Sequence, residues 1–150
     1  MKISTKGRYA VRVMLDMAVH TESEYMPLRL VASRQDISEK YMEAIAGMLV
    51  KDNLLYSVRG KGGGYKLARD PKDYTILEII ESVEGPLAPV VCLMPEAEAC
   101  DREGECFALP LWKGLYEEIK TYLSNVTLED LVERKLDGSL ELDKTTKFDL

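Results

Sequence analysis

Apolar side chains recur every three or four positions along about the first fifty residues, and this spacing predicts three helices. The first runs from Thr5 to Thr21. The second is short, opens at Pro27 and ends near Gln35 and Asp36. Ser38 is a favourable N-cap for the third. The apolar positions are Tyr9, Val13, Met14, Met17 and Ala18, then Leu28, Leu30, Val31 and Ala32, then Tyr41, Ile45, Met48 and Leu49. The short link between the second and third helices suits a helix-turn-helix.

Two strand-like segments, 54–58 and 65–67, follow and flank a loop that contains four glycines. Glycine lets such a loop turn tightly and brings its backbone close to a partner. Residues 57–69 carry four positive charges and no negative one, so the expected partner is polyanionic. With the preceding helices, this basic β-hairpin predicts a winged helix-turn-helix. An ordinary surface hairpin is the alternative, whereas the glycine spacings of phosphate-binding enzyme loops do not occur here.

The second half of the sequence predicts further helices. Thr75 and Glu78 have the spacing of a capping box, ahead of a helix that Gly85 and Pro86 end. A longer apolar stripe from Trp112 to Val126 persists for about four turns. A helix of this kind in a small protein is expected to bury its stripe against a second copy, and packing on its own domain is the alternative. The predicted fold class is mostly α with a small β-hairpin, a winged helix-turn-helix plus a long dimerisation helix, with a short last helix at 127–132.

The distribution of charge divides the chain into two halves. The 150 residues, 46% of them hydrophobic, suit one domain with an appendage, and the net charge is −6. Residues 1–72 contain 13 Lys and Arg against 8 Asp and Glu (net +5), whereas residues 73–150 contain 7 against 18 (net −11). We predict a DNA-binding domain over 1–72, a cysteine loop with dimerisation helices over 73–135, and a flexible tail over 136–150. No membrane span or signal peptide is recognisable, so a soluble, cytoplasmic protein is expected.

In a winged helix-turn-helix the third helix enters the major groove with its first turn toward the base edges. The residues expected there are Ser38, Lys40, Tyr41 and Glu43. Because phosphate repels a carboxylate, Glu43 would accept from a cytosine amino group or penalise wrong sites. Phosphate or minor-groove contacts are expected from Lys2, Lys6, Arg8, Arg59, Gly60 and Lys61. Singly, each of these charges is compatible with an ordinary surface side chain, and Tyr41 with core packing; together they predict one DNA-binding surface.

All three cysteines fall within 15 residues: Cys92, Cys100 and Cys106. The segment around them, 86–107, is rich in proline, glycine and acids and is predicted to lack regular structure. A structural disulfide set is not expected in a cytosolic protein, and zinc sites favour closer cysteine pairs with a fourth Cys or His nearby. An iron–sulfur cluster fits this spacing better, with zinc or thiol chemistry, or no metal, as alternatives. No acid–base constellation stands beside a nucleophile, so an enzyme is not expected.

Three segments together resemble the Rrf2 family of bacterial winged-helix transcription regulators. They are the opening MKISTKGRYA, the wing VRGKGGGY at 58–65, and the cysteine loop followed by Leu111 and Trp112. The resemblance covers about residues 1–135. It implies a homodimer with crossed long helices on a palindromic DNA operator, and Cys92, Cys100 and Cys106 as ligands of an iron–sulfur cluster, expected to be 2Fe–2S. Such regulators sense cluster status and control iron–sulfur cluster biogenesis genes, which makes iron–sulfur scaffold proteins expected partners.

The resemblance also implies DNA contacts at Ser38, Lys40, Tyr41, Glu43 and Arg59, with Glu43 helping to select between classes of site. Other members sense nitric oxide, and others regulate cysteine metabolism through a protein partner; a thiol switch is a further alternative. The chain departs from the cluster-sensing pattern at Leu109, where relatives have a histidine, and at Arg8, where nitric-oxide sensors can supply an acid. The fourth ligand is therefore open. The candidates are His20, Glu43, Asp101, Glu103, Glu105 or an exogenous group.

Overall fold

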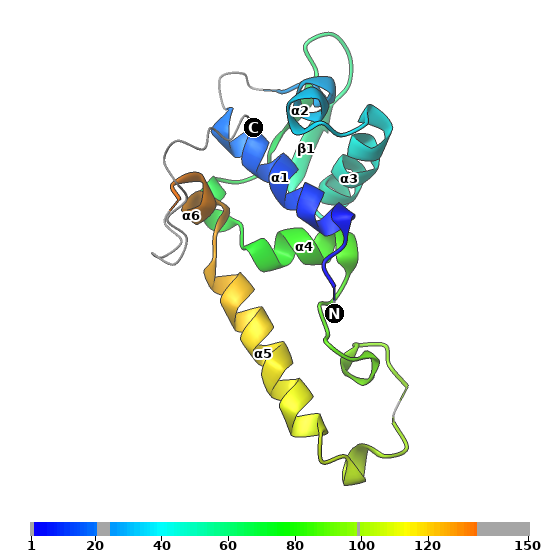
Figure 1. The fold of residues 1–150 in the computed structure, drawn as a ribbon. Helices are drawn as coiled ribbons and strands as arrows, with labels where there is room; N and C mark the ends of the chain where they lie inside the picture. The colour runs from blue at the N-terminus through cyan, green and yellow to red at the C-terminus, as the bar shows by residue number, and fades with distance from the viewer. Residues whose placement is uncertain (1, 21–24, 99, 135–150) are drawn as a thin grey trace.

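The chain folds into a helical body with one β-hairpin, and a long helix stands away from that body (Figure 1). This computed structural model describes residues 2–20, 25–98 and 100–134. The elements are α1 (Thr5–Val19), α2 (Leu28–Gln35), α3 (Glu39–Lys51), β1 (Leu55–Val58), β2 (Gly64–Leu67), α4 (Ile76–Glu84), α5 (Leu109–Asn125) and α6 (Leu128–Val132). Single 3₁₀ turns lie at Pro71–Asp73, Val91–Leu93 and Glu103–Glu105.

These elements confirm the predicted fold class, mostly α with a small β-hairpin. The first helix is shorter than its periodicity predicts: α1 ends at Val19. Its predicted end, Thr21, lies outside the described residues, as does the tail predicted at 136–150. The described residues of the segment 86–107 are irregular as predicted, apart from two 3₁₀ turns.

The turn between α2 and α3 is built by the residues that end one helix and begin the next. Asp36 adopts a left-handed conformation (φ 52°, ψ 49°), which a short polar side chain tolerates. The Ile37 amide then donates to the Ala32 carbonyl at 3.0 Å, as in a Schellman motif. Ser38 begins α3 by accepting from the Tyr41 amide. The predicted helix-turn-helix is therefore formed.

A buried carboxylate joins α1 to α2. Asp16 is fully buried, and a buried charge is costly unless it is paired. Its oxygens accept from Nε of Arg34 at 3.1 and 3.0 Å, from Nη2 of the same side chain, and from Nε2 of Gln35 at 2.8 Å. The hydrogen bond to Asp16 raises the pKa of Arg34, although desolvation opposes the shift. Directional contacts, and not apolar packing alone, therefore fix α2 on α1.

The hairpin is attached to the body through strand β2. Strands β1 and β2 pair antiparallel, with Leu55 opposite Leu67 and Val58 opposite Gly64. Strand β2 also pairs with Met26, whose amide donates to the Tyr65 carbonyl at 2.8 Å and whose carbonyl accepts from the Tyr65 amide at 2.9 Å. These backbone bonds place the wing beside the start of α2.

Buried Tyr74 connects the wing to the second half of the chain. Its hydroxyl donates to the Leu54 carbonyl at 2.9 Å and accepts from the Arg69 amide at 2.8 Å. Burial raises the pKa of this phenol, and the hydrogen bond from Arg69 opposes the rise. The Tyr74 carbonyl accepts from the Leu128 amide at 3.0 Å. Tyr74 therefore contacts the wing through its side chain and α6 through its backbone.

The capping box forms at a different helix from the one predicted. Thr75 does accept from the Glu78 amide at 3.2 Å, but the Glu78 carboxylate forms an ion pair with Arg69 instead of returning to Thr75. The reciprocal arrangement occurs at α6, where Thr127 and Asp130 bond to each other in both directions. The ion pair with Arg69 occupies the Glu78 carboxylate, so the capping box at Thr75 stays incomplete, whereas the one at Thr127 is complete.

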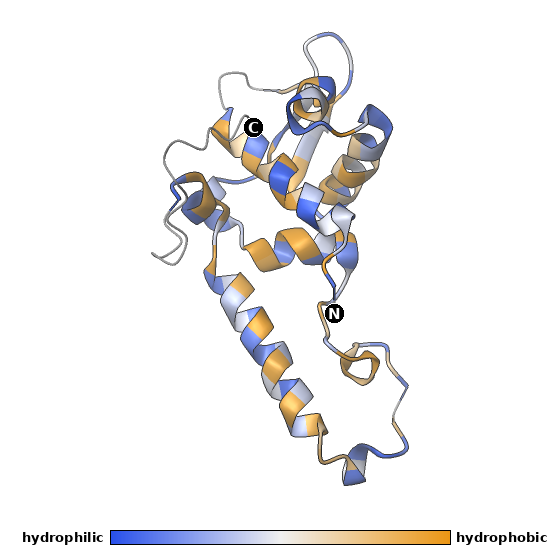
Figure 2. Cartoon of the chain, in the orientation of Figure 1, coloured by the Kyte–Doolittle hydropathy of each residue, from blue (hydrophilic) through white to orange (hydrophobic). Residues whose placement is uncertain are grey.

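Helix α5 exposes most of its apolar stripe. None of its residues is buried, and Leu111, Leu115 and Tyr122 are 63%, 43% and 63% exposed. Apolar and polar residues alternate along the helix in Figure 2, with only Ile119 and Leu123 packed against the core. The predicted stripe is present, and packing against the other described residues does not bury it. Over the described ranges, no helix is long and apolar enough to cross a membrane.

Glu84, the last residue of α4, caps the first turn of α1. Its Oε1 accepts from the amides of Ser4 at 3.0 Å and Gly7 at 2.9 Å, and from the Ser4 hydroxyl. A carboxylate is favourable there because the first helical amides lack intrahelical partners. A Cβ on Gly7 would lie 2.5 Å from that oxygen, so a larger residue there would displace the capping carboxylate. Burial raises the pKa of Glu84, but these hydrogen bonds outweigh it and leave the pKa below its usual value.

We predict that Arg34→Ala lowers the free energy of unfolding by about 3 kcal/mol, because Asp16 would stay buried without its charged partner. Urea denaturation followed by circular dichroism, at one fixed protein concentration, measures the loss. Arg29→Ala, an exposed change on the same helix, is the control and should stay within about 0.5 kcal/mol of wild type. Similar small losses in both variants would contradict the role given to Asp16.

The lowered pKa of Glu84 predicts a pH-dependent contribution to stability. A carboxylate with a depressed folded-state pKa stabilises fully above its ordinary value of about 4.5, and this stabilisation is lost as pH falls through the folded-state pKa. Glu84→Gln should therefore be less stable than wild type at neutral pH, and the difference should shrink in acid. Urea titrations across this range test it, with exposed Glu96→Gln as the control. A difference that is constant with pH would exclude the titration of Glu84 as its cause.

Candidate nucleic-acid interface and cysteine loop

The first turn of α3 is open to solvent. Ser38, Lys40 and Glu43 are exposed, and Tyr41 is half-buried. The Ser38 hydroxyl lies 3.4 Å from the Tyr41 amide, so it serves the helix as a cap and remains at the surface. The opposite face of α3 enters the core through Met42, Ile45 and Leu49. The helix is thus fixed from behind while its first turn faces outward.

The hairpin presents its basic tip in the same unobstructed way. Arg59, Gly60 and Lys61 are all exposed. Gly60 has φ 100°, a conformation that other residues rarely adopt, so the tight turn between the two cations depends on it. The flanking strand residues Tyr56 and Val58 are 52% and 46% exposed, which places partly apolar side chains beside the charges.

The start of α1 contributes two further cations. Arg8 is exposed and its Nη2 donates to Thr5 Oγ1 at 3.1 Å. Lys6 is half-buried, and its charge is one of the influences that lower the pKa of Glu84. Tyr9, one residue beyond Arg8, meets Tyr41 edge to face, with ring centroids 5.9 Å apart. The predicted contact residues thus stand on three elements, and the structure joins α1 to α3 through this ring pair.

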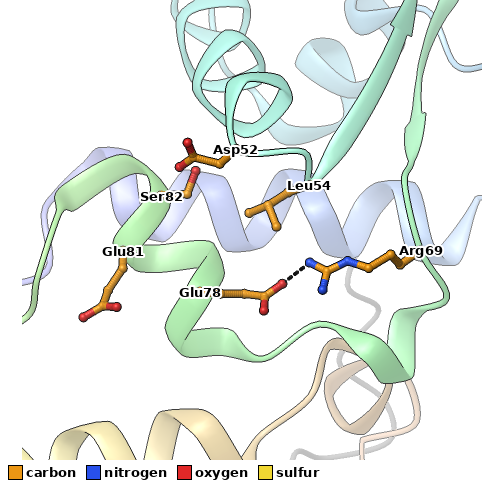
Figure 3. A pocket seen from close by; sticks show the side chains of 6 residues that line it. All are labelled: Asp52, Leu54, Arg69, Glu78, Glu81 and Ser82. Atoms are coloured by element: carbon orange, nitrogen blue, oxygen red, sulfur yellow. Dashed lines mark hydrogen bonds and ion pairs between the residues drawn. The ribbon is translucent and has the colours of Figure 1, made fainter.

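A pocket of about 390 Å³ between the end of α3 and α4 has the opposite polarity (Figure 3). It is lined by Asp52, Leu54, Arg69, Glu78, Glu81 and Ser82. Because Arg69 is paired with Glu78, the two remaining carboxylates leave the lining negative. The Ser82 hydroxyl is buried and has no hydrogen-bond partner among the described residues. A negative lining repels phosphate, so the nucleic-acid surface lies elsewhere.

The three cysteines occupy the loop between α4 and α5. Cys92 lies in the turn Val91–Leu93 and is exposed, as is Cys100, whereas Cys106 is half-buried. Within the described part of the chain, no three His, Cys, Asp or Glu side chains lie close enough to hold a metal ion. The donor chemistry fits, because thiolates are the usual ligands of iron–sulfur clusters. The loop, as folded, does not bring these thiols together.

The candidates for a fourth ligand are also dispersed. His20 lies at the end of α1, where its Nδ1 is 2.9 Å from the Asp16 carbonyl oxygen. Glu43 is exposed on α3. In the loop, Asp101, Glu103 and Glu105 are exposed, and Glu103 lies 3.9 Å from the Lys113 ammonium. Leu109 is the first residue of α5. The structure therefore favours none of these candidates.

Residues that organise this surface without belonging to the predicted set are Arg12, Asp16 and Glu84. Arg12 Nε donates to the Gln35 side-chain oxygen at 2.9 Å, and its Nη2 donates to the Gln35 carbonyl at 2.7 Å. The available sequence signal was weak: Arg12 and Asp16 lie four residues apart on a helix whose other central residues are largely apolar. Their partners come from distant segments, which periodicity does not reveal.

Comparison with known proteins agrees with this arrangement. Residues 3–134 match the Rrf2 family, described as iron-dependent transcriptional regulators. The HTH-type transcriptional regulator IscR of Xenorhabdus nematophila is 38% identical over 135 residues, 90% of this chain and 81% of that one. The structure of T. potens IscR is 33% identical with a TM-score of 0.68, over 93% and 92% of the two chains. CymR of B. subtilis, called the global cysteine regulator, is 36% identical with a TM-score of 0.70, over 89% and 98%.

The match extends over nearly all of the described chain, from the helix-turn-helix and wing to α6. The similar proteins include IscR and CymR, and both are named as regulators rather than enzymes. Family and fold agree with the exposed first turn of α3 and the basic wing tip. The chain belongs to the Rrf2 family and is a DNA-binding, winged-helix transcription regulator.

Proposed function

We propose that this regulator senses iron–sulfur cluster status and controls iron–sulfur cluster biogenesis genes. The observation that carries the proposal is a loop with three free thiols, two exposed and one half-buried, in a chain similar to regulators named IscR. In functional terms, residues 1–72 bind DNA, residues 73–135 carry the sensing loop and the dimer contacts, and cluster delivery by iron–sulfur scaffold proteins supplies the signal.

On the DNA side, the first turn of α3 enters the major groove and the wing lies along the neighbouring backbone. The residues that make contact are Lys6, Arg8, Ser38, Lys40, Tyr41, Glu43, Arg59, Gly60 and Lys61. Exposure of nearly all of these side chains supports this assignment, as does the net positive charge of residues 1–72. Glu43 contributes selectivity, because a carboxylate near phosphate is tolerated only where a base donates to it.

A second copy of the chain covers the stripe of α5. Exposed Leu111, Leu115 and Tyr122 would otherwise remain in water along one helix. Two copies whose long helices cross bury these side chains against each other and give the dimer a two-fold axis. A palindromic operator then matches the symmetry of the protein, with one wing and one α3 per half-site.

In the sensing loop, Cys92, Cys100 and Cys106 are the proposed ligands of a 2Fe–2S cluster. When bound, such a cluster supplies a redox-active centre whose occupancy depends on cellular supply. This chain's own contribution is three soft thiolates on a segment without regular structure, free to wrap around a ligand. Leu109 offers no donor atom, so the fourth ligand stays open between His20, an acid such as Glu43, Asp101, Glu103 or Glu105, and an exogenous group. A site held by three thiolates empties readily.

The similarity to CymR favours a second candidate function. Here the cysteines act as a thiol switch, or a protein partner controls the regulator, in connection with cysteine metabolism. Exposed Cys92 and Cys100 are accessible to oxidants and to partners without any metal. The three clustered thiols favour the first candidate, because a partner-controlled regulator does not need them.

We predict that Arg59→Ala weakens binding to an operator duplex by about 1–3 kcal/mol if Arg59 reads a base, and relaxes sequence preference at that position. Lys61→Ala should weaken all duplexes alike and reduce the salt slope by about 1, as loss of a phosphate contact does. Fluorescence anisotropy at several salt concentrations, on a duplex selected from a random pool, measures both. Exposed Lys72→Ala, away from the wing, is the control. Unchanged affinity in both wing variants would remove the wing from the interface.

For the cluster, we predict that protein purified without oxygen is coloured and contains equal amounts of iron and sulfide. Replacing any one of Cys92, Cys100 or Cys106 by Ser should abolish the visible absorption and leave the far-ultraviolet circular dichroism unchanged, because the loop lies outside the core. Retained colour in all three single variants would exclude these ligands. Protein that stays colourless after reconstitution with iron and sulfide would favour the thiol or partner-controlled candidate.

A further inference from the structure

The ring of Tyr9 is the aromatic neighbour of Tyr41 in the described structure. The two rings meet edge to face, with centroids 5.9 Å apart and planes inclined at 75°. Both residues are half-buried against the core. Within the described residues, the Tyr41 hydroxyl makes no internal hydrogen bond, so its ring is oriented by packing on the core and by the contact with Tyr9. A residue of α1 therefore helps to orient a side chain in the first turn of α3.

Tyr9 is itself fixed by Arg12. The Arg12 guanidinium carbon lies 5.2 Å from the centre of the Tyr9 ring, within reach of a cation–π contact. The same guanidinium donates to the side-chain and main-chain oxygens of Gln35, at 2.9 and 2.7 Å. Gln35 in turn donates to buried Asp16 at 2.8 Å. The Tyr9 ring is thus fixed at the C-terminal end of α2, next to the turn that leads into α3.

We propose that Tyr9 is a positioning residue for DNA recognition: it sets the orientation of Tyr41, and through it the discrimination between operator and other DNA. The inference rests on the proposed DNA contact of Tyr41. Phosphate-led, non-specific binding depends on exposed cations and does not require this ring. Loss of the ring pair should therefore affect specific binding and leave general affinity for DNA in place.

The test compares Tyr9→Ala, Tyr9→Phe and Val11→Ala, each binding a selected operator duplex and a random-sequence duplex of equal length. Val11 is half-buried on the same helix and has no ring, so its variant reports on loss of packing alone. Tyr9→Ala should weaken operator binding about three- to tenfold, in line with an aromatic pair, and lower the operator-to-random ratio by the same factor. Tyr9→Phe, which retains the ring, should match wild type.

A double-mutant cycle identifies the residue through which Tyr9 acts. In a Tyr41→Ala background, adding Tyr9→Ala should cost no further operator affinity. An undiminished cost there would overturn the proposal. So would a loss in Tyr9→Phe equal to that in Tyr9→Ala, which would make the Tyr9 hydroxyl a direct contact. Equal losses for Tyr9→Ala and Val11→Ala on both duplexes would reduce Tyr9 to a packing residue.

A readout without DNA separates this inference from the proposed function. In tyrosine-labelled protein, the Tyr41 ring resonances, assigned by their absence in Tyr41→Phe, should shift in Tyr9→Ala and stay in place in Tyr9→Phe. If Tyr41→Ala retained full operator affinity, the DNA role of Tyr41 would fall and the positioning role with it. If the wild-type protein selected no operator, the proposed function would fail, and unmoved Tyr41 resonances would overturn the ring contact independently.

Discussion

The carboxylate of Asp16 lies wholly inside the protein, and its charge has to be met there. The groups that meet it, Arg34 and Gln35, belong to α2, so the position of that helix on α1 is set by directional bonds. Arg34 also lies 2.8 Å from the sulfur of Met26, which pairs through its backbone with Tyr65 of the wing. Through these contacts the one carboxylate links α1 to α2, and α2 to strand β2 of the wing.

Local patterns were sufficient for most of the fold. The helices and the hairpin were predictable because apolar periodicity, a serine cap and a glycine loop act within a few residues of themselves. The capping box at Thr75 failed for the opposite reason: Glu78 met an arginine from a neighbouring segment. The ion pair of Asp16 with Arg34 and the cap that Glu84 places on α1 join residues far apart in sequence. The periodicity of apolar residues does not predict such contacts.

The sequence predicts which segments form the cysteine loop and the wing, but it does not predict how their side chains are arranged in space. Composition located the cysteine loop, and charge located the wing, since both are properties of short segments. The arrangement of Cys92, Cys100 and Cys106 has no such local determinant, because the loop contains only brief 3₁₀ turns to fix its path. Regulators named IscR and CymR share this frame. The shared frame therefore does not by itself say which signal a member responds to, since fold alone does not set function.

The four glycines of the wing are not equivalent. A Cβ at Gly63 would lie 2.2 Å from the Val58 carbonyl oxygen, and one at Gly64 would lie 2.4 Å from that of Met26. Gly60 and Gly62 face open space and are limited only by their backbone conformation, which asparagine tolerates at φ 79° better than most residues. Of these four positions, only Gly60 and Gly62 therefore have room for a side chain. A substitution at Gly62 can alter what the tip offers to a groove while Gly63 and Gly64 keep the path of the hairpin unchanged.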